Sequence, residues 1–269
     1  MAGKERLKER KVKCINSILV AFFDILGFKA IIEEKGFEHV NSLYDDFGRM
    51  IDVINTPVPD GITRTNQFEF SKEKLSLIYF SDCVVWAYPM EAIAKPDYWD
   101  AVISLITKMN SFYLLSFGRG VLIRGGITIE DLFIKGNKVF GKGLVRAYEL
   151  EQMAEFSQVV LDPCILRNSV QPPNAEQSRF FLPLLSEDPN KRFYSIDYFK
   201  YISQICRALP DEHEIARAII QPYVDPLVKL IRQGIKHPEE KVRCKYEWLR
   251  SGMLSIKNLD YDLSSIMVE

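Results

Sequence analysis

Two aspartates with apolar neighbours are the residues of this sequence best placed to do chemistry. Asp24 interrupts the apolar run Ile18-Leu-Val-Ala-Phe-Phe-Asp-Ile-Leu-Gly-Phe28, and Asp82 divides two β-rich runs at 75–80 and 83–88. Burying an isolated carboxylate costs on the order of several kcal/mol unless a partner or a metal compensates. Two alternatives stay open at this point: Asp24 caps a helix after a strand that ends at Phe23, and Asp82 is an ordinary hairpin-turn residue.

The elements around these aspartates can be predicted from apolar patterning. Residues 15–23 form a near-continuous apolar run, which is typical of a strand covered on both faces. Gly27 then allows a turn, and helices are expected at 28–35, where Gly36 ends the first, and at 40–54. The dipeptide Ser81-Asp82 is predicted at the turn of a β-hairpin.

The elements that follow complete the predicted fold class. A long helix is expected at 98–117, a strand at 121–129, a helix at 143–156 and a strand at 158–161. Gly125 and Gly126 weaken the strand and indicate a bulge or a close backbone approach. The order β-α-α-β-β-α-β-α-β predicts an α+β fold of the ferredoxin-like kind, one sheet with helices on one face.

The last third of the chain has a different character. A polar, turn-rich section follows Pro163, then short strands are expected near 180–185 and 193–196 and helices at 197–207, 212–235 and 238–256. Pro222 and Pro226 should kink the middle helix. We therefore expect a basic N-terminal arm at 1–14, a catalytic domain at 15–165, and a mixed, mainly helical extension at 166–269 that serves packing or dimerisation.

Composition narrows the classes of function. The 269 residues carry a formal net charge of −1, which gives no general reason to expect a nucleic-acid or membrane binder. The five cysteines are scattered without a CxxC pair, and no apolar stretch of about 20 residues or secretory signal is present. The expected location is the cytoplasm. His39, His213 and His237 are far apart, which disfavours a zinc site.

The two aspartates belong together if their strands are neighbours. In a ferredoxin-like sheet both carboxylates then project at one end and converge. Converging carboxylates repel one another unless a cation lies between them, and hard oxygen ligands select Mg²⁺ or Mn²⁺. Two such ions, about 3.5–4 Å apart, activate an attacking oxygen and neutralise a leaving phosphate. The geometry predicts phosphoryl chemistry.

Four motifs resemble the class III nucleotidyl cyclases over about residues 15–165. They are Phe22-Phe-Asp-Ile-Leu-Gly-Phe28, Tyr79-Phe-Ser-Asp-Cys-Val-Val85, Leu122-Ile-Arg-Gly-Gly-Ile-Thr128 and Val139-Phe-Gly-Lys-Gly-Leu-Val-Arg-Ala-Tyr-Glu-Leu-Glu151. The resemblance implies two Mn²⁺ (or Mg²⁺) ions, held by Asp24, Asp82 and the backbone carbonyl of Ile25. It also implies that backbone amides around Phe28 cradle the triphosphate and that Phe22 or Phe23 lies near the nucleotide.

The sequence departs from the family pattern at the positions that bind the nucleotide base. Ile78 and Lys138 stand where adenylate-forming members carry a lysine and an acidic residue that bind adenine, so ATP is disfavoured. Lys138 can still contact a phosphate.

The family's transition-state Asn and Arg fall on Val145 and Glu149. Arg146 and Arg124 are the candidates to supply positive charge in their place. A salt bridge at the sheet edge is an equally good interpretation of Arg124.

Within this class the motifs look most like the bacterial pyrimidine cyclases of the Pycsar antiphage systems. The resemblance implies conversion of UTP, or less favourably CTP, into a 3′,5′-cyclic nucleotide that a downstream effector reads. It also implies a homodimer with sites at the subunit interface. A degenerate nucleotide-binding module without turnover and a purine nucleotide cyclase remain the alternatives.

Overall fold

The computed structural model describes residues 18–54, 76–90, 98–135, 138–167, 173–188, 190, 192–208, 213–256, 259 and 261–267. At 50–54, 208 and 213–217 only the backbone is described. The expected basic arm at 1–14 lies outside these residues. The fold below is that of the described ranges.

The central strand continues past Asp24. Strand β1 (Ile18–Leu26) pairs antiparallel with β3 (Cys83–Pro89) on one side and with β4 (Leu122–Glu130) on the other, and Asp24 lies opposite Cys83 and Arg124. Gly27, at φ 75°, then turns the chain into the next helix. The prediction that the strand ends at Phe23 is wrong, and so is the alternative that Asp24 caps a helix.

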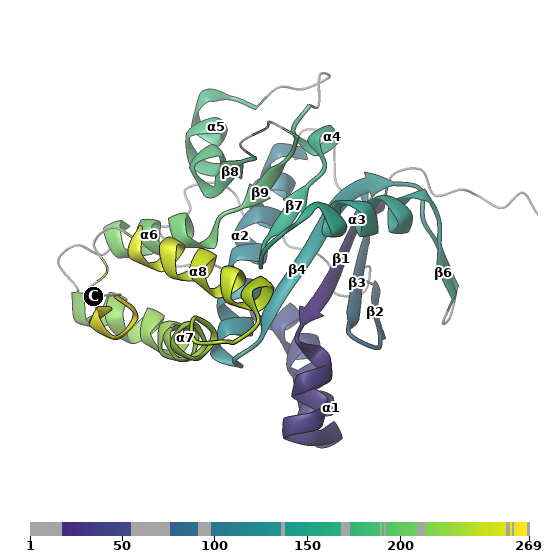
Figure 1. The fold of residues 1–269 in the computed structure, drawn as a ribbon. Coiled ribbons are helices and arrows are strands. Elements are labelled where there is room, and N and C mark those ends of the chain that lie inside the picture. The colour runs from purple at the N-terminus through teal and green to yellow at the C-terminus, as the bar shows by residue number, and fades with distance from the viewer. Residues whose placement is uncertain are drawn as a thin grey trace, which may run out of the picture.

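One seven-stranded sheet organises the molecule (Figure 1), in the order β2-β3-β1-β4-β7-β9-β8. Its other strands are β2 (Ser76–Phe80), β7 (Val159–Leu161), β8 (Leu185–Glu187) and β9 (Tyr194–Ile196), and a separate hairpin pairs β5 (Phe133–Lys135) with β6 (Lys138–Phe140). The predicted α+β class and the hairpin around Ser81-Asp82 are confirmed. Two sheet strands come from beyond residue 165, although the proposed division of the chain there stays a prediction.

The predicted helices are confirmed, and two further helices, α4 and α5, were not predicted. The helices are α1 (Phe28–Ile54), α2 (Tyr98–Gly118), α3 (Lys142–Met153), α4 (Pro163–Leu166), α5 (Ala175–Phe181), α6 (Tyr198–Ala208), α7 (His213–Gly234) and α8 (Glu240–Leu254), with 3₁₀ turns at Leu182–Leu184 and Ser264–Ile266. Gly36 (φ 77°) breaks α1 as expected. The strand predicted near 180–185 is instead the end of α5 and a 3₁₀ turn, because Asn174 and Gln177 form a capping box that starts a helix.

Helices cover both faces of the sheet, so the expectation of one covered face is wrong. Alternation along β1 sends Phe23 into a core shared with α1, α2, α6 and α7, and Phe22 into a second cluster that contains Ala147 of α3. Figure 1 shows α3 and α2 on opposite sides of β4. Gly126 permits the approach of α3, because a Cβ there would lie 2.2 Å from the Ala147 carbonyl oxygen. The predicted close backbone approach is therefore confirmed.

Helix α2 is long and apolar enough to cross a membrane by length and composition. Within the fold, however, 83% of its most apolar window is buried. It packs against β4, α5 and α7 as the central helix of the larger core. A buried core helix passes the same compositional test as a membrane span, so α2 gives only weak support for one.

Candidate metal centre

The structure brings Asp24 and Asp82 together at one end of the sheet. One ligand atom from each of Asp24, Asp82 and Cys83 lies within 4.8 Å of the others. The β2–β3 turn reaches this position through Ser81 in a left-handed conformation (φ 53°), and the Ile25 N–H donates to the Asp82 carbonyl oxygen at 2.9 Å. Pairing of β1 with the hairpin thus fixes the two carboxylates side by side.

The backbone carbonyl of Ile25 points toward the same turn. In an antiparallel strand, one residue directs its N–H and its C=O to the same neighbouring strand. Because the N–H of Ile25 bonds to Asp82, its carbonyl oxygen is directed to the Asp82 side as well. Two carboxylates and a carbonyl are the hard oxygen ligands that Mg²⁺ and Mn²⁺ prefer, so the residues present fit such an ion.

Arg124 supplies positive charge beside Asp24. Its Nη2 lies 3.6 Å from Asp24 Oδ2, and the same nitrogen forms an ion pair with Glu151, whose side chain is 1% exposed. Its Nη1 donates to the Ala154 carbonyl at 3.3 Å. The salt bridge considered for Arg124 therefore exists, but in the interior of the sheet, since β4 has a neighbour on each side.

The surroundings of Asp24 favour the protonated form of its carboxyl group when no metal cation is bound. Burial, and then the Glu151 charge, raise the pKa of Asp24 to about 6, although Arg124 opposes the change. Burial and the neighbouring Asp82 raise the pKa of the Cys83 thiol to about 12, so this residue stays a neutral thiol that donates to Asp82 Oδ1 at 3.5 Å. Three carboxylates, those of Asp24, Asp82 and Glu151, therefore lie near the single guanidinium of Arg124.

A lysine of the C-terminal extension also faces this centre, and sequence reasoning missed it. Lys245 of α8 interacts electrostatically with both Asp24 and Arg124. Burial and the Arg124 charge lower the pKa of Lys245, whereas Asp24 raises it. Nothing in the local pattern of α8 signals this role, because the contact depends on how α8 folds back onto the sheet.

Phe22 and Phe28 flank the aspartates in different ways. Phe22 is 5% exposed and lies 5.6 Å from the ring of Tyr148 and 6.3 Å from that of Phe80, measured between ring centroids. Phe28 is the first residue of α1 and lies half-buried at 6.3 Å from the ring of Tyr44. The Tyr44 hydroxyl donates to the Ser81 carbonyl, which ties α1 to the aspartate-bearing turn.

Within one chain, the structure does not bring Arg146 or Lys138 to the two aspartates. Arg146 donates through Nε to Asp162 Oδ2 at 2.7 Å, and Asp162 also accepts from Thr128, four residues along β4 from Arg124. Lys138 is exposed on β6. The roles assigned to these two residues stay predictions.

Comparison with known proteins finds similarity at the level of solved structures. No protein-family model matches the chain, and no curated protein matches it.

The guanylate cyclase domain of RhGC from Catenaria anguillulae, in complex with GTP, is similar at a TM-score of 0.42 and 11% identity, over 68% of this chain and 96% of that one. The monomeric guanylyl cyclase domain of the RhoGC fusion protein from Blastocladiella emersonii gives 0.41 and 11%, over 67% and 94%. The catalytic core of a rhodopsin-guanylyl cyclase with converted specificity, in complex with ATPαS, gives 0.40 and 13%, over 67% and 95%. At these identities the residues of the metal centre, rather than overall similarity, must support a function.

Proposed function

We propose that this protein is a nucleotide cyclase that converts a nucleoside triphosphate into its 3′,5′-cyclic monophosphate and pyrophosphate. One observation carries the proposal: Asp24 and Asp82 meet at the end of adjacent strands with ligand atoms within 4.8 Å. The order of the motifs around them, which resembles that of class III cyclases, supports the same reaction. The ribose 3′-oxygen bonds to the α-phosphorus as the bond from that phosphorus to the β-phosphate oxygen breaks.

Asp24, Asp82 and the Ile25 carbonyl would hold two Mn²⁺ or Mg²⁺ ions. When bound, such ions lower the pKa of the attacking hydroxyl and neutralise the phosphates. The residues of the chain do the rest: backbone amides at the start of α1, around Phe28, face anions favourably. Arg124 adds a fixed positive charge beside Asp24 and suits charge that develops on the α-phosphate.

A pyrimidine nucleotide is the proposed substrate, with UTP favoured over CTP. Ile78 packs against the cluster around Phe22, and its side chain offers no hydrogen bond to the edge of a base. Lys138, at the second position that binds adenine in adenylate-forming relatives, carries the wrong charge for that task. The resemblance to the Pycsar cyclases further supports a cyclic nucleotide that acts as an alarm signal in the cytoplasm and is read by an effector.

A homodimer would complete the site. Exposed apolar side chains lie beside Phe22: Phe80 (44% exposed) and Tyr148 (49%) contact its ring, and Val145 (58%) and Phe140 (57%) belong to α3 and β6, whose neighbouring residues pack against the same cluster. Exposed apolar residues gathered on one face are typical of an interface. Arg146 and Lys138 belong to the same face of the chain, α3 and the β5–β6 hairpin, so a second copy packed there would bring them nearer to the aspartates than one chain does.

The test is to incubate purified protein with each of the four nucleoside triphosphates and Mn²⁺, and to identify products by mass spectrometry. Cyclic UMP, or less of cyclic CMP, is expected from the unaltered protein, and no product from Asp24→Ala or Asp82→Ala. A cyclic purine nucleotide as the main product would replace the pyrimidine assignment. Product formation unaffected by either substitution would exclude this centre as the site of catalysis.

A second candidate is a nucleotide-binding module without turnover. Glu149 stands where the family carries a transition-state arginine, and it pairs with Arg146 at 3.4 Å, which reduces the free positive charge on α3. Binding of UTP and Mn²⁺ by calorimetry, together with no release of pyrophosphate from the dimer, would favour this candidate.

A further inference from the structure

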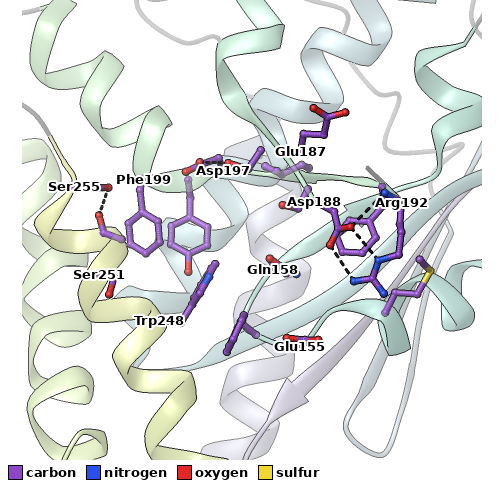
Figure 2. A pocket seen from close by; sticks show the side chains of 18 of the residues that line it. Glu155, Gln158, Glu187, Asp188, Arg192, Asp197, Phe199, Trp248, Ser251 and Ser255 are labelled. Atoms are coloured by element: carbon purple, nitrogen blue, oxygen red, sulfur yellow. Dashed lines mark hydrogen bonds and ion pairs between the residues drawn. The ribbon is translucent and has the colours of Figure 1, made fainter. Parts of the chain in front are cut away.

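A cavity lies away from the metal centre, between the end of the sheet and helix α8. Its volume is about 620 Å³, within the range of small-molecule sites. It is lined by α8, by the segment 155–158 that joins α3 to β7, and by β8, β9 and the start of α6. Figure 2 shows Phe199, Trp248 and Ser251 at one end and Asp188 and Arg192 at the other, with Glu155 and Gln158 between them.

One end of the cavity is aromatic. The rings of Phe156 and Trp248 are stacked at 5.2 Å with an interplanar angle of 6°, and the Phe199 ring lies 5.8 Å from Trp248. Phe156 and Trp248 are only half-buried, so part of this aromatic surface borders the cavity. Gly252 makes room for the arrangement, because a Cβ there would lie 2.0 Å from the Phe199 ring. This end suits a flat, apolar group.

The lining of the cavity as a whole carries excess negative charge. Two of its four acidic residues have cationic partners: Arg192 binds Asp188 through two nitrogens at 3.0 Å, and Lys200 lies 3.5 Å from Asp197. The other two, Glu155 and Glu187, are exposed and form no close ion pair with a residue that the structure describes: Glu155 interacts with the Arg192 charge at longer range, and Glu187 accepts a hydrogen bond from the Tyr194 hydroxyl at 3.3 Å. Two carboxylates at the mouth of a partly enclosed site attract a cation and repel a triphosphate.

We propose that this cavity is a binding site for a small organic cation that carries a flat apolar group. The flat group would lie on the aromatic surface of Phe156 and Trp248, and the cationic group would face Glu155 and Glu187. Aromatic faces and carboxylates both attract cations, and enclosure strengthens both attractions. The ligand is therefore of the opposite charge to the proposed nucleotide substrate, and the site does not depend on the proposed function.

The experiment compares two probes with the same ring and opposite charge, tryptamine and indole-3-propionate. Each is titrated into the full-length protein by calorimetry at low ionic strength, without nucleotide or metal. We expect saturable binding of one tryptamine and at least tenfold weaker binding of indole-3-propionate. Absence of saturable tryptamine binding, or equal affinity for the two probes, would overturn the proposal.

Substitutions assign the binding to this cavity. The double variant Glu155→Gln/Glu187→Gln removes two exposed charges without altering the core, and should weaken tryptamine binding at least about fivefold. Glu38→Gln, on exposed α1, is the matched control and should leave it unchanged. Asp24→Ala should also leave tryptamine binding unchanged. If tryptamine binding were lost in Asp24→Ala but kept in the double variant, the cation would bind at the metal centre, and its assignment to the cavity would be wrong.

Discussion

The metal centre and the cavity beside α8 differ in where their charged side chains lie and in what balances them. At the metal centre, buried Glu151 and half-buried Asp24 share one guanidinium, Arg124, and the backbone holds each group in register. In the cavity the carboxylates Glu155 and Glu187 are exposed, and neither forms a close ion pair within the described residues. Charge inside a fold needs an internal partner, whereas charge at its surface can be left for a ligand.

The largest expected effect tests whether the metal centre alone carries the chemistry. Asp82→Ala or Asp24→Ala removes a carboxylate that is proposed to bind the metal ions, so the rate of cyclic nucleotide formation should fall at least about 1,000-fold, or about 4 kcal/mol. Product is quantified by mass spectrometry at saturating nucleotide. Asp45→Ala, on the exposed surface of α1, is the control.

Rate losses of less than about tenfold in both aspartate variants would contradict the assignment of catalysis to the metal centre. The cavity would then have to be considered as a catalytic site as well. Full activity in Glu155→Gln/Glu187→Gln would sharpen the contrast, because it would show that the cavity acids do not take part in the reaction.

The second prediction concerns how rigid the two regions are. Gly126→Ala places a Cβ 2.2 Å from the Ala147 carbonyl oxygen, a backbone atom, so α3 must move off the sheet. Gly252→Ala meets the ring of Phe199, a side chain that can shift. We expect Gly126→Ala to lower the free energy of unfolding by about 3 kcal/mol and Gly252→Ala by about 1–2 kcal/mol.

Urea titrations followed by circular dichroism measure both values. Gly48→Ala is the control, since its Cβ would meet only the Tyr79 hydroxyl at an ordinary 3.7 Å and alanine favours a helix. Equal losses in the two variants would mean that the cavity wall is as rigid as the packing of α3 on β4.

The third prediction follows from the raised pKa of Asp24. The unfolded group ionises near 3.8 and the folded one near 6, so the folded chain binds the proton more tightly. The stability that this proton provides is fully present below about pH 4 and is lost as the pH rises through 6. Asp24→Asn avoids the buried charge, and should raise the free energy of unfolding at pH 7.5 by about 1–2 kcal/mol after solvent screening.

The gain of Asp24→Asn should disappear at pH 4. Urea titrations at the two pH values, without divalent ions, provide the measurement, with Asp45→Asn as the control. A variant less stable than the unaltered protein at pH 7.5 would show that attraction to Arg124 outweighs the cost of burial at this position.

The smallest expected effect tests whether the two regions communicate. The segment 154–158 contributes the carbonyl of Ala154 to Arg124 and the side chains of Glu155 and Phe156 to the cavity, and Lys245 lies one helical turn from Trp248. A cation in the cavity should therefore change the dissociation constant for Mn²⁺ by about two- to threefold, and Mn²⁺ should change tryptamine binding by the same factor. Calorimetric titration of each in the presence of the other measures this linkage; unchanged constants would make the regions independent.

The elements of the metal centre could be predicted because they depend on local patterns. An apolar run with one carboxylate, and a Ser-Asp turn between β-rich runs, place Asp24 and Asp82 on neighbouring strands once the fold class is known. The charged partners around them are different. Glu151 lies on a helix and Lys245 on the extension, and both reach the centre only through tertiary packing, which a sequence pattern does not encode.

The cavity could not be predicted for the same reason. Its walls come from α8, from β8 and β9, and from the connection between α3 and β7, so that residues as far apart in the sequence as Met153 and Ser255 line it together. The strand expected near 193–196 is confirmed as β9, but its pairing with β7 and β8 in the main sheet was not predicted, because that pairing depends on tertiary packing.

The position of Arg124 affects the stability of the protein when no metal ion is bound. Because Arg124 already balances part of the charge of Asp24, and the raised pKa of Asp24 lets a proton bind as the pH falls toward 6, we expect the chain to fold without an ion. Folding and metal loading are then separate events, in contrast to domains that a metal holds together. Under the proposed function, folded protein without metal would be inactive, and the supply of divalent ions would set the active fraction.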